Sequence, residues 1–282
     1  MSLDAIKEQK IGPFSYQTWG QGEQTVVYLH GWQDNGNSFL PLQPFCNNKA
    51  YQHIALDFAG HGRSDWKSED AFYYFIDYVY DLKCFLDQAN INRCHLVGHS
   101  MGAMVANLFA ACFPSRCLSL VLIEGIGIVS TLESDTRTQL INAFNSRDKL
   151  KQSEPRVYPD INTLALLRSK VSDISVELAT LLMNRNCEQH KNGIQLTLDP
   201  RLKHHSGFRY SVAQAQSALE GITTPTLLIL AEQGYAMIQR QYSQFKRCFA
   251  TLKVEKIPGG HHCHMENPEI CYKLIDAHQR SA

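Results

Sequence analysis

Short apolar runs alternate with helix-like patterns along most of the chain. Six runs are rich in β-branched and aliphatic residues and are bounded by turn-forming residues, which is typical of β-strands. They cover residues 25–30, 53–57, 94–98, 118–124, 226–231 and 253–257. Several are apolar at every position, as in strands buried on both faces. Helical spacing of apolar residues is found at residues 72–88, 101–113, 235–249 and 268–279. The pattern predicts an α/β fold with a mostly parallel central sheet flanked by helices.

The alternation stops between residues 126 and 217. This segment carries three helical patterns separated by polar turns, at residues 131–150, 162–170 and 175–186. Structureless connections longer than about 15 residues are uncommon, so a segment of this length is expected to fold as an inserted unit. We therefore expect a helical cap subdomain at residues 126–217, over a core formed by residues 1–125 and 218–282.

The composition is that of an ordinary globular protein. Basic and acidic residues both number 27, so the formal net charge is zero and nothing favours nucleic acid as a partner. The nine cysteines form no Cys-x-x-Cys pair, and the first ten residues lack the apolar core of a secretory signal. No apolar run approaches the roughly 20 residues that cross a bilayer. We expect a cytoplasmic protein with reduced thiols and no membrane anchor.

Ser100 lies in the most informative motif of the sequence. Residues 98–102 read Gly-His-Ser-Met-Gly, directly after a predicted strand and before a predicted helix. In this setting the pattern is the nucleophile elbow, whose glycines allow a sharp turn and a close approach of neighbouring backbone. We expect Ser100 to be a nucleophile, and the alternative is a buried serine in an ordinary tight turn.

A second motif, His-Gly-Trp at residues 30–32, ends an earlier predicted strand. In hydrolases with a nucleophile elbow, the chain after that strand supplies one backbone N–H group to the oxyanion hole, and the residue after the nucleophile supplies another. We therefore expect the N–H groups of Trp32 and Met101 to be the two donors. The alternative is a plain turn with Trp32 in the core.

Four segments occur in the order found in one large family: HGWQDN (30–35), LDFAGHGRSD (56–65), GHSMGA (98–103) and PGGHHCHMENP (258–268). They show that the chain resembles the α/β-hydrolase superfamily, most closely its serine hydrolase-like branch. The resemblance spans roughly residues 11–124 and 221–278, and it implies the α/β-hydrolase fold and a Ser-His-acid triad without a cofactor or metal. Serine at the elbow argues against epoxide hydrolase and haloalkane dehalogenase chemistry, which use a carboxylate nucleophile in this fold.

The histidine-rich segment near the end of the chain is expected to supply the general base. The late motif of the family, G-H-x-x-H-x-E-x-P, aligns with residues 260–268 and implies that His261 is the base, with His262 as the alternative. His264 is expected to pack nearby. A metal site built from the run that ends with Cys263 and His264 is disfavoured, because consecutive side chains point in different directions whereas zinc ligands converge.

The triad acid is the point at which this sequence departs from the family. Members commonly place an aspartate after the strand at residues 226–231, but the expected position here is Gly234. Glu124 ends an earlier strand at the same sheet edge, from which some α/β hydrolases take their acid. We expect Glu124 to be the acid, and Glu232, in the usual loop, is the alternative. Glu124 could also simply line the pocket or bind backbone N–H groups.

The residues and the resemblance together predict a serine hydrolase that cleaves small or medium carboxylic esters through an acyl-enzyme. Its expected partner is therefore a small-molecule ester. Two alternatives stay open: carbon–carbon bond hydrolysis or perhydrolysis on the same triad, and a ligand-binding α/β hydrolase without catalysis, which only Gly234 favours. The sequence leaves open whether Arg201, in the segment LTLDPRL (196–202), contacts the substrate.

Overall fold

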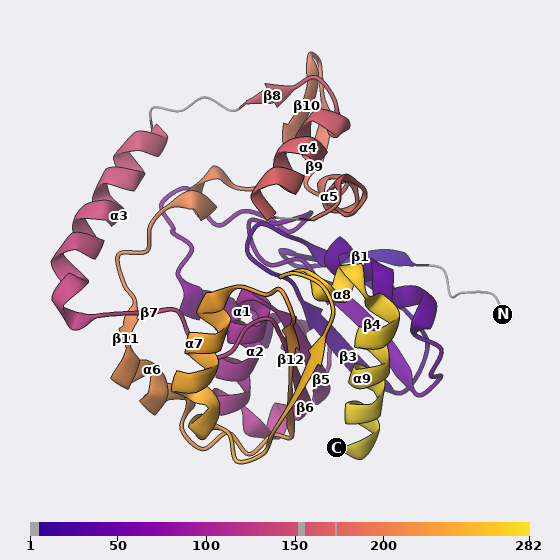
Figure 1. Cartoon of the computed structure of the whole chain (residues 1–282). Coiled ribbons are helices and arrows are strands. Elements are labelled where there is room, and N and C mark those ends of the chain that lie inside the picture. Colours follow the sequence, from indigo (N-terminus) through magenta and orange to yellow (C-terminus); the bar gives the residue numbers. More distant parts are fainter. Residues whose placement is uncertain (1–5, 152–155, 173) are drawn as a thin grey trace.

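An eight-stranded sheet forms the centre of the molecule (Figure 1). The structure is a computed structural model that describes residues 6–151, 156–172 and 174–282. The strands, in spatial order, are β1 (Lys7–Ile11), β2 (Phe14–Trp19), β4 (Tyr51–Leu56), β3 (Gln24–Leu29), β5 (Cys94–His99), β6 (Cys117–Ile123), β12 (Thr226–Ala231) and β13 (Leu252–Ile257). From β4 to β13 all neighbours are parallel. The predicted mostly parallel sheet is confirmed.

The central strands are apolar throughout because each is buried on both faces. Successive side chains of a strand point to opposite faces, and in β3 Val27 and Leu29 join one apolar cluster whereas Val26 and Tyr28 join the other. Strands β5, β6 and β12 alternate in the same way. The sheet therefore has a hydrophobic core on each side, and helices must cover both.

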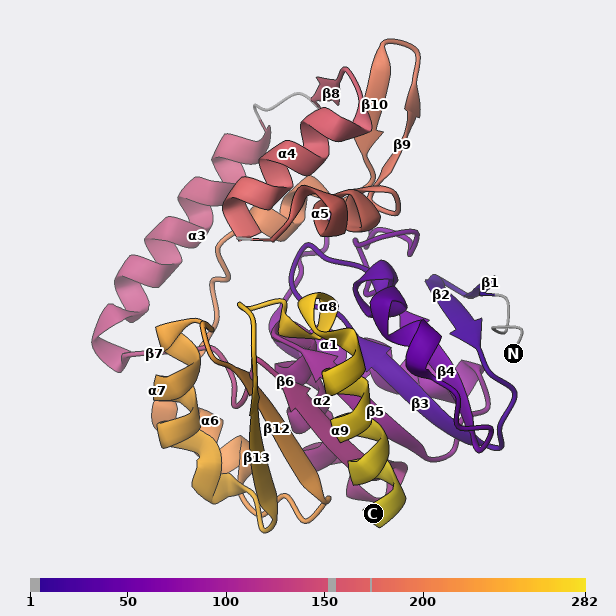
Figure 2. The same ribbon diagram turned by 45° about the vertical axis from the view of Figure 1, so that its right-hand side comes forward.

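Each face of the sheet has its own set of helices (Figure 2). One core is covered by α1 (Phe75–Gln88), α2 (Met101–Cys112), α6 (Val212–Leu219) and α7 (Ala236–Phe245). The other is covered by the 3-10 helix η1 (Gly36–Phe45), α8 (Cys263–Glu266) and α9 (Pro268–Ser281). The four helices predicted for this part of the chain are present as α1, α2, α7 and α9, and the sequence reading missed η1, α6 and α8.

Strands β1 and β2 were also missing from the sequence-based prediction. They form an antiparallel hairpin around Gly12, which has a positive φ, and β2 pairs antiparallel with β4. The five residues of β1 are mostly exposed and polar. Because β1 is an edge strand with little apolar surface, its sequence lacks the alternation that identifies a half-buried strand.

The sequence predicted only helices in the segment between β6 and β12, but the structure also has short strands there. Its helices are α3 (Thr136–Lys151), α4 (Ile161–Ser172) and α5 (Val176–Met183), followed by α6. Short strands accompany them: β8 (Val157–Tyr158), β9 (Cys187–His190) and β10 (Gly193–Leu196) form one small sheet, and β7 (Ser130–Thr131) pairs with β11 (Tyr210–Ser211). This segment also contains the short 3-10 helices η3 (Glu133–Asp135) and η4 (Pro200–Lys203). Two more lie outside it, η2 (Pro114–Arg116) and η5 (Lys246–Cys248). The division into core and cap subdomains stays a prediction.

Part of this insertion lies over the end of the sheet at which α8 is found (Figure 2). Two buried ion pairs connect the insertion to the rest of the chain. Arg185, which follows α5, binds Asp57 at 2.8 Å and also Glu8, and Arg168 of α4 binds Asp34 at 2.5 Å. Breaking a buried pair of this kind typically costs about 3–5 kcal/mol, because a buried charge is left unpaired. The charges therefore fix α4 and α5 over this edge of the sheet.

Candidate active site

Three chain segments that follow parallel strands meet at one edge of the sheet. Ser100 follows β5, Glu124 follows β6, and His261 lies in the turn after β13. Parallel strands end at the same edge, and β5 and β6 are direct neighbours, with β12 and β13 next in order. This topology brings residues far apart in sequence to one place, as in other open α/β sheets whose sites lie at the carboxyl ends of strands.

Ser100 occupies a tight turn between β5 and α2. Its φ is 51°, a value that non-glycine residues rarely adopt, and its N–H donates to the carbonyl oxygen of Ile123 at 2.8 Å. The flanking glycines are needed for close contact: a Cβ at Gly98 would meet the backbone of α2, and a Cβ at Gly102 would meet the carbonyl of Leu29. The strained serine is therefore held from both sides by backbone.

A chain of hydrogen bonds connects Ser100, His261 and Glu124. The Oγ atom of Ser100 lies 2.9 Å from Nε2 of His261, and Nδ1 of His261 lies 3.2 Å from Oε2 of Glu124. The other carboxylate oxygen of Glu124 accepts from the N–H of Ala231 at 2.7 Å. When Nδ1 of His261 donates to Glu124, Nε2 is free to accept the serine proton, which is the tautomer that a general base needs.

The alternative base and the alternative acid lie elsewhere. Nε2 of His262 faces Asp34 at 3.3 Å instead of facing Ser100. Glu232 is exposed, and Gly234 begins the turn that leads to α7. The structure therefore brings together the residues that the sequence favoured and separates both alternatives from the nucleophile.

His261 is held at its ring and at its backbone. The ring of Tyr235 stacks on it, with 4.2 Å between ring centroids and an interplanar angle of 18°. Nε2 of His99 lies 2.8 Å from the carbonyl oxygen of His261, at the distance of a hydrogen bond. Tyr235 itself is partly exposed, so the stacked pair faces the outside of the site. The sequence analysis assigned no role to Tyr235.

The two expected oxyanion donors follow neighbouring strands, β3 and β5, at the sheet edge that carries the nucleophile. Met101 is the first residue of α2, and N–H groups in the first turn of a helix have no acceptor within that helix. Trp32 follows β3, and its half-exposed side chain donates from Nε1 to the carbonyl of Leu202 in the insertion at 3.2 Å. The alternative interpretation placed Trp32 in the core, but its side chain is half exposed. His30 accepts from the N–H of Phe58 at 3.0 Å and so fixes the start of this loop.

A buried polar cluster that the sequence analysis missed lies next to His261. It consists of Asp34, His99, His262 and Arg168, with Asp34 in contact with all three. Burial by itself would raise the pKa of Asp34, but His262, Arg168 and His99 hold it well below its usual value. Burial lowers the pKa of His99 well below 6.5, and the neighbouring histidines lower it further. The motif HGWQDN contained the signal, since Asp34 is a charged residue inside a buried loop.

Asp57 and Arg201 have structural partners. Asp57 accepts from the N–H groups of Gly36 and Arg63 and pairs with Arg185. Arg201 binds Asp199 and donates to the carbonyls of residues 67, 68, 69 and 71. With its guanidinium donors used in this way, Arg201 holds a loop of the core to the insertion, and its contacts give no support to a substrate role.

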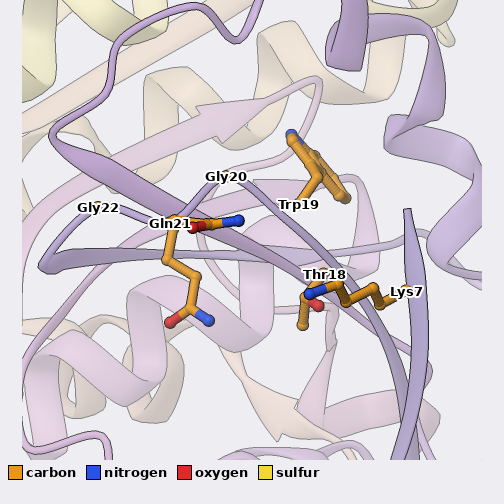
Figure 3. Close-up of a pocket in the computed structure, with 7 residues that line it drawn as sticks. Lys7, Thr18, Trp19, Gly20, Gln21 and Gly22 are labelled. Atoms are coloured by element: carbon orange, nitrogen blue, oxygen red, sulfur yellow. The ribbon is translucent and has the colours of Figure 1, made fainter. Parts of the chain in front are cut away.

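A separate pocket of about 310 Å³ lies at the opposite edge of the sheet (Figure 3). It is lined by Lys7, Thr18, Trp19, Gly20, Gln21, Gly22 and Gln52. Trp19 pairs with His53 near the start of β4, so the pocket lies at the amino ends of the parallel strands, away from Ser100. It contains no candidate nucleophile beside a base.

Among the described residues, no helix combines the length and the apolar character that a membrane span requires.

Comparison with known proteins gives the family. Residues 24–268 match the family described as alpha/beta hydrolase fold. The serine hydrolase-like protein of Danio rerio is 28% identical over 280 residues, which cover 94% of this chain and 84% of that protein. Serine hydrolase-like protein 2 of Homo sapiens is 28% identical, over 96% of this chain and 93% of that protein. The crystal structure of a hypothetical protein from Pseudomonas aeruginosa PAO1 superposes with a TM-score of 0.83 at 30% identity, covering 98% and 95% of the two chains. The chain belongs to the α/β-hydrolase superfamily, in its serine hydrolase-like branch.

Proposed function

We propose that the protein is a serine hydrolase that cleaves carboxylic esters through an acyl-enzyme. The observation that carries this proposal is the continuous Ser100–His261–Glu124 hydrogen-bond chain, with distances of 2.9 and 3.2 Å. A serine hydroxyl is a weak nucleophile by itself, and a neighbouring imidazole that a third group orients is the usual way to activate it. The serine, the imidazole and the orienting carboxylate all lie at one sheet edge.

In the first half-reaction Nε2 of His261 takes the proton of Ser100 as Oγ attacks the ester carbonyl. Glu124 holds the imidazole in the required tautomer and stabilises the imidazolium that forms. The imidazolium then gives its proton to the leaving alcohol, and the acyl group stays on Ser100. Water, deprotonated by His261, hydrolyses this acyl-enzyme and regenerates the free serine.

The developing oxyanion is stabilised by the N–H groups of Met101 and Trp32 in this proposal. Fixed donors of this kind stabilise the transition state more than the substrate, and each typically contributes about 2.7–4 kcal/mol. The N-terminus of α2 adds a favourable field for negative charge beside Ser100. No cofactor or metal ion takes part in these steps.

The substrate class follows from the surroundings of the triad. Trp32 and Tyr235 expose aromatic surface at the sheet edge that carries the triad, and Trp32 contacts the insertion through Leu202. Exposed aromatic surface at this edge favours an uncharged ester. We therefore propose small or medium acyl groups, bound between the oxyanion loop and the insertion.

The test is a series of p-nitrophenyl esters with acetyl, octanoyl and palmitoyl groups, assayed with the wild type and Ser100→Ala. We expect wild-type turnover of the first two, weaker turnover of the third, and a loss of roughly 10⁶ in kcat for Ser100→Ala or His261→Ala. A vinylogous 1,5-diketone and a peracid assay on the same preparations test carbon–carbon hydrolysis and perhydrolysis. Activity on the diketone without ester turnover would contradict the ester assignment and keep the triad.

A further inference from the structure

Three buried side-chain atoms behind the catalytic histidine converge on one point. They are Oδ2 of Asp34, Nδ1 of His99 and Nε2 of His262, which all lie within 4.8 Å of one another. The two distances to Asp34 are 3.7 Å from His99 and 3.3 Å from His262. Each of the three residues is at most 4% exposed. The cluster lies outside the triad, on the far side of the His261 backbone.

Two of these atoms, Nδ1 of His99 and Oδ2 of Asp34, are hydrogen-bond acceptors that face each other without a donor between them. In the neutral ring of His99, the hydrogen bond from Nε2–H to the carbonyl of His261 leaves a bare lone pair on Nδ1. No described residue offers a hydrogen bond to this Nδ1. It points instead toward the carboxylate oxygen of Asp34 at 3.7 Å. Two acceptors in this arrangement leave a place for a positive charge between them.

The backbone of Gly31 packs closely against two of these atoms. A Cβ added to Gly31 would lie 2.9 Å from Oδ2 of Asp34 and 3.1 Å from Nδ1 of His99, closer than side-chain carbons normally approach. Glycine at residue 31 therefore keeps away a side chain that would collide with both atoms.

We propose that Asp34, His99 and His262 bind a divalent transition-metal ion, with Zn²⁺ as the ion that fits best, and that this ion inhibits the hydrolase. Two imidazoles and one carboxylate are a donor set that zinc accepts, and ligands about 2.0–2.1 Å from a tetrahedral zinc lie roughly 3.4 Å apart. Two of the three separations, 3.3 and 3.7 Å, bracket that value, and the third lies within 4.8 Å.

The inhibitory part rests on the proposed function and follows from the position of His261. His262 is the next residue in the chain, and His99 binds the carbonyl of His261 at 2.8 Å. Drawing His99 and His262 toward a common ion shifts the backbone that carries the catalytic imidazole. Misplacement of a catalytic group by about 1 Å can cost roughly 100-fold in rate.

Arg168 opposes the metal ion. Its guanidinium binds Oδ1 of Asp34 and leaves Oδ2 to the two histidines, but it also brings a positive charge close to the place of the dication. Removing this charge should therefore tighten metal binding, although the same change removes an ion pair that holds the insertion. A substitution that strengthens binding cannot be explained by general loss of structure.

The experiment is a titration of the full-length protein with Co²⁺, followed by the visible absorption bands that a four-coordinate cobalt site produces, with Zn²⁺ as competitor. All variants carry Ser100→Ala, so binding is measured independently of hydrolysis. We expect His262→Gln and Asp34→Asn to weaken binding at least 10-fold, and Arg168→Gln to tighten it about 10-fold. His261→Gln should leave binding within about 3-fold, because this histidine faces the triad.

Controls separate the site from other places where metals bind. Cys112 is an exposed thiol, and a thiolate ligand would add a charge-transfer band in the near ultraviolet that Cys112→Ser would remove. Circular dichroism shows whether each variant is folded. If His262→Gln does not fold, Asp34→Asn and Arg168→Gln decide whether the cluster binds metal. The proposal is wrong if no four-coordinate spectrum appears, if His261→Gln abolishes it, or if Arg168→Gln weakens binding. If metal binds but the wild type keeps its ester turnover, the site stands and its inhibitory role is wrong.

Discussion

The carboxylate of Glu124 occupies the space that a side chain at residue 234 would need. A Cβ added to Gly234 would lie 2.6 Å from Oε1 of Glu124 and still closer to Oε2. Glu124 has a φ of 48°, a conformation that costs a non-glycine residue about 1–3 kcal/mol. The glycine that replaces the usual aspartate is therefore the residue that lets Glu124 reach His261, and the two positions act as one unit.

The first prediction concerns the acid. Glu124→Gln should lower kcat by roughly 10⁴, because an amide no longer stabilises the imidazolium or enforces the productive tautomer of His261. Steady-state kinetics on the best p-nitrophenyl ester measure this. Glu232→Gln is the matched control and should keep the wild-type rate, since Glu232 is exposed. The opposite ranking of these two variants would transfer the acid role to Glu232.

A second prediction exchanges the two positions. Gly234→Asp alone should be inactive or unstable, because its side chain collides with Glu124. Glu124→Gly removes the acid and suits the positive φ at that position. The double variant should then exceed Glu124→Gly in kcat by about 10-fold or more, as an aspartate returns from the β12 loop. Equal rates of the double variant and Glu124→Gly would show that residue 234 cannot reach His261.

The elbow gives a prediction about stability. Gly102→Ala should lower the free energy of unfolding by at least about 2 kcal/mol, because the added methyl group meets the carbonyl of Leu29 in a packed core. Urea denaturation measures the change. Gly207→Ala is the control, since a Cβ there would have its nearest neighbour at 3.6 Å and should alter stability by less than about 0.5 kcal/mol. Similar effects of both variants would disprove close packing at the elbow.

Buried histidines predict the response to acid. Burial lowers the pKa of His30 to about 4, of His53 to about 4 and of His61 to about 3, from 6.5. The unfolded chain therefore binds protons first as the pH falls. The contribution of these histidines to the free energy of unfolding is fully present above about pH 6.5. Between pH 6.5 and 4 it falls by up to about 1.4 kcal/mol per pH unit for each histidine.

Urea denaturation at a series of pH values tests this dependence. The variant His53→Gln should have a smaller slope, by up to about 1.4 kcal/mol per pH unit, because one buried histidine that titrates on unfolding is removed. A free energy of unfolding that stays constant from pH 6.5 to 4.5 would contradict the burial of neutral imidazoles.

The parts of the fold that the sequence predicted are those with a strong periodic signal. The continuously apolar strands around Val27 and Leu228 must be buried on both faces, and this alone indicates a parallel sheet with helices on each side. Strand β1 escaped prediction because it is exposed and polar, and η1 because Pro41 and Pro44 interrupt its pattern. The sequence analysis missed the β9–β10 hairpin, although Asn192, the last residue of its turn, is followed by Gly193, and an Asn-Gly pair is a turn signal.

The site was predictable in its residues and less so in its geometry. Ser100 and His261 lie in motifs that fix their roles relative to a strand and a helix. The choice between Glu124 and Glu232 depends on which carboxylate reaches Nδ1 of His261, and a one-dimensional pattern holds no such distance. The Asp34 cluster joins residues from four distant segments, so only the folded chain reveals it.

The central claim is that Ser100 is an activated nucleophile. Incubation of the purified protein with excess fluorophosphonate, followed by intact mass measurement, tests it directly, since only an activated serine reacts and loses the fluoride. We predict a single adduct on the wild type and none on Ser100→Ala. A folded wild-type protein that gains no adduct, or a Ser100→Ala variant labelled to the same extent, would contradict the assignment.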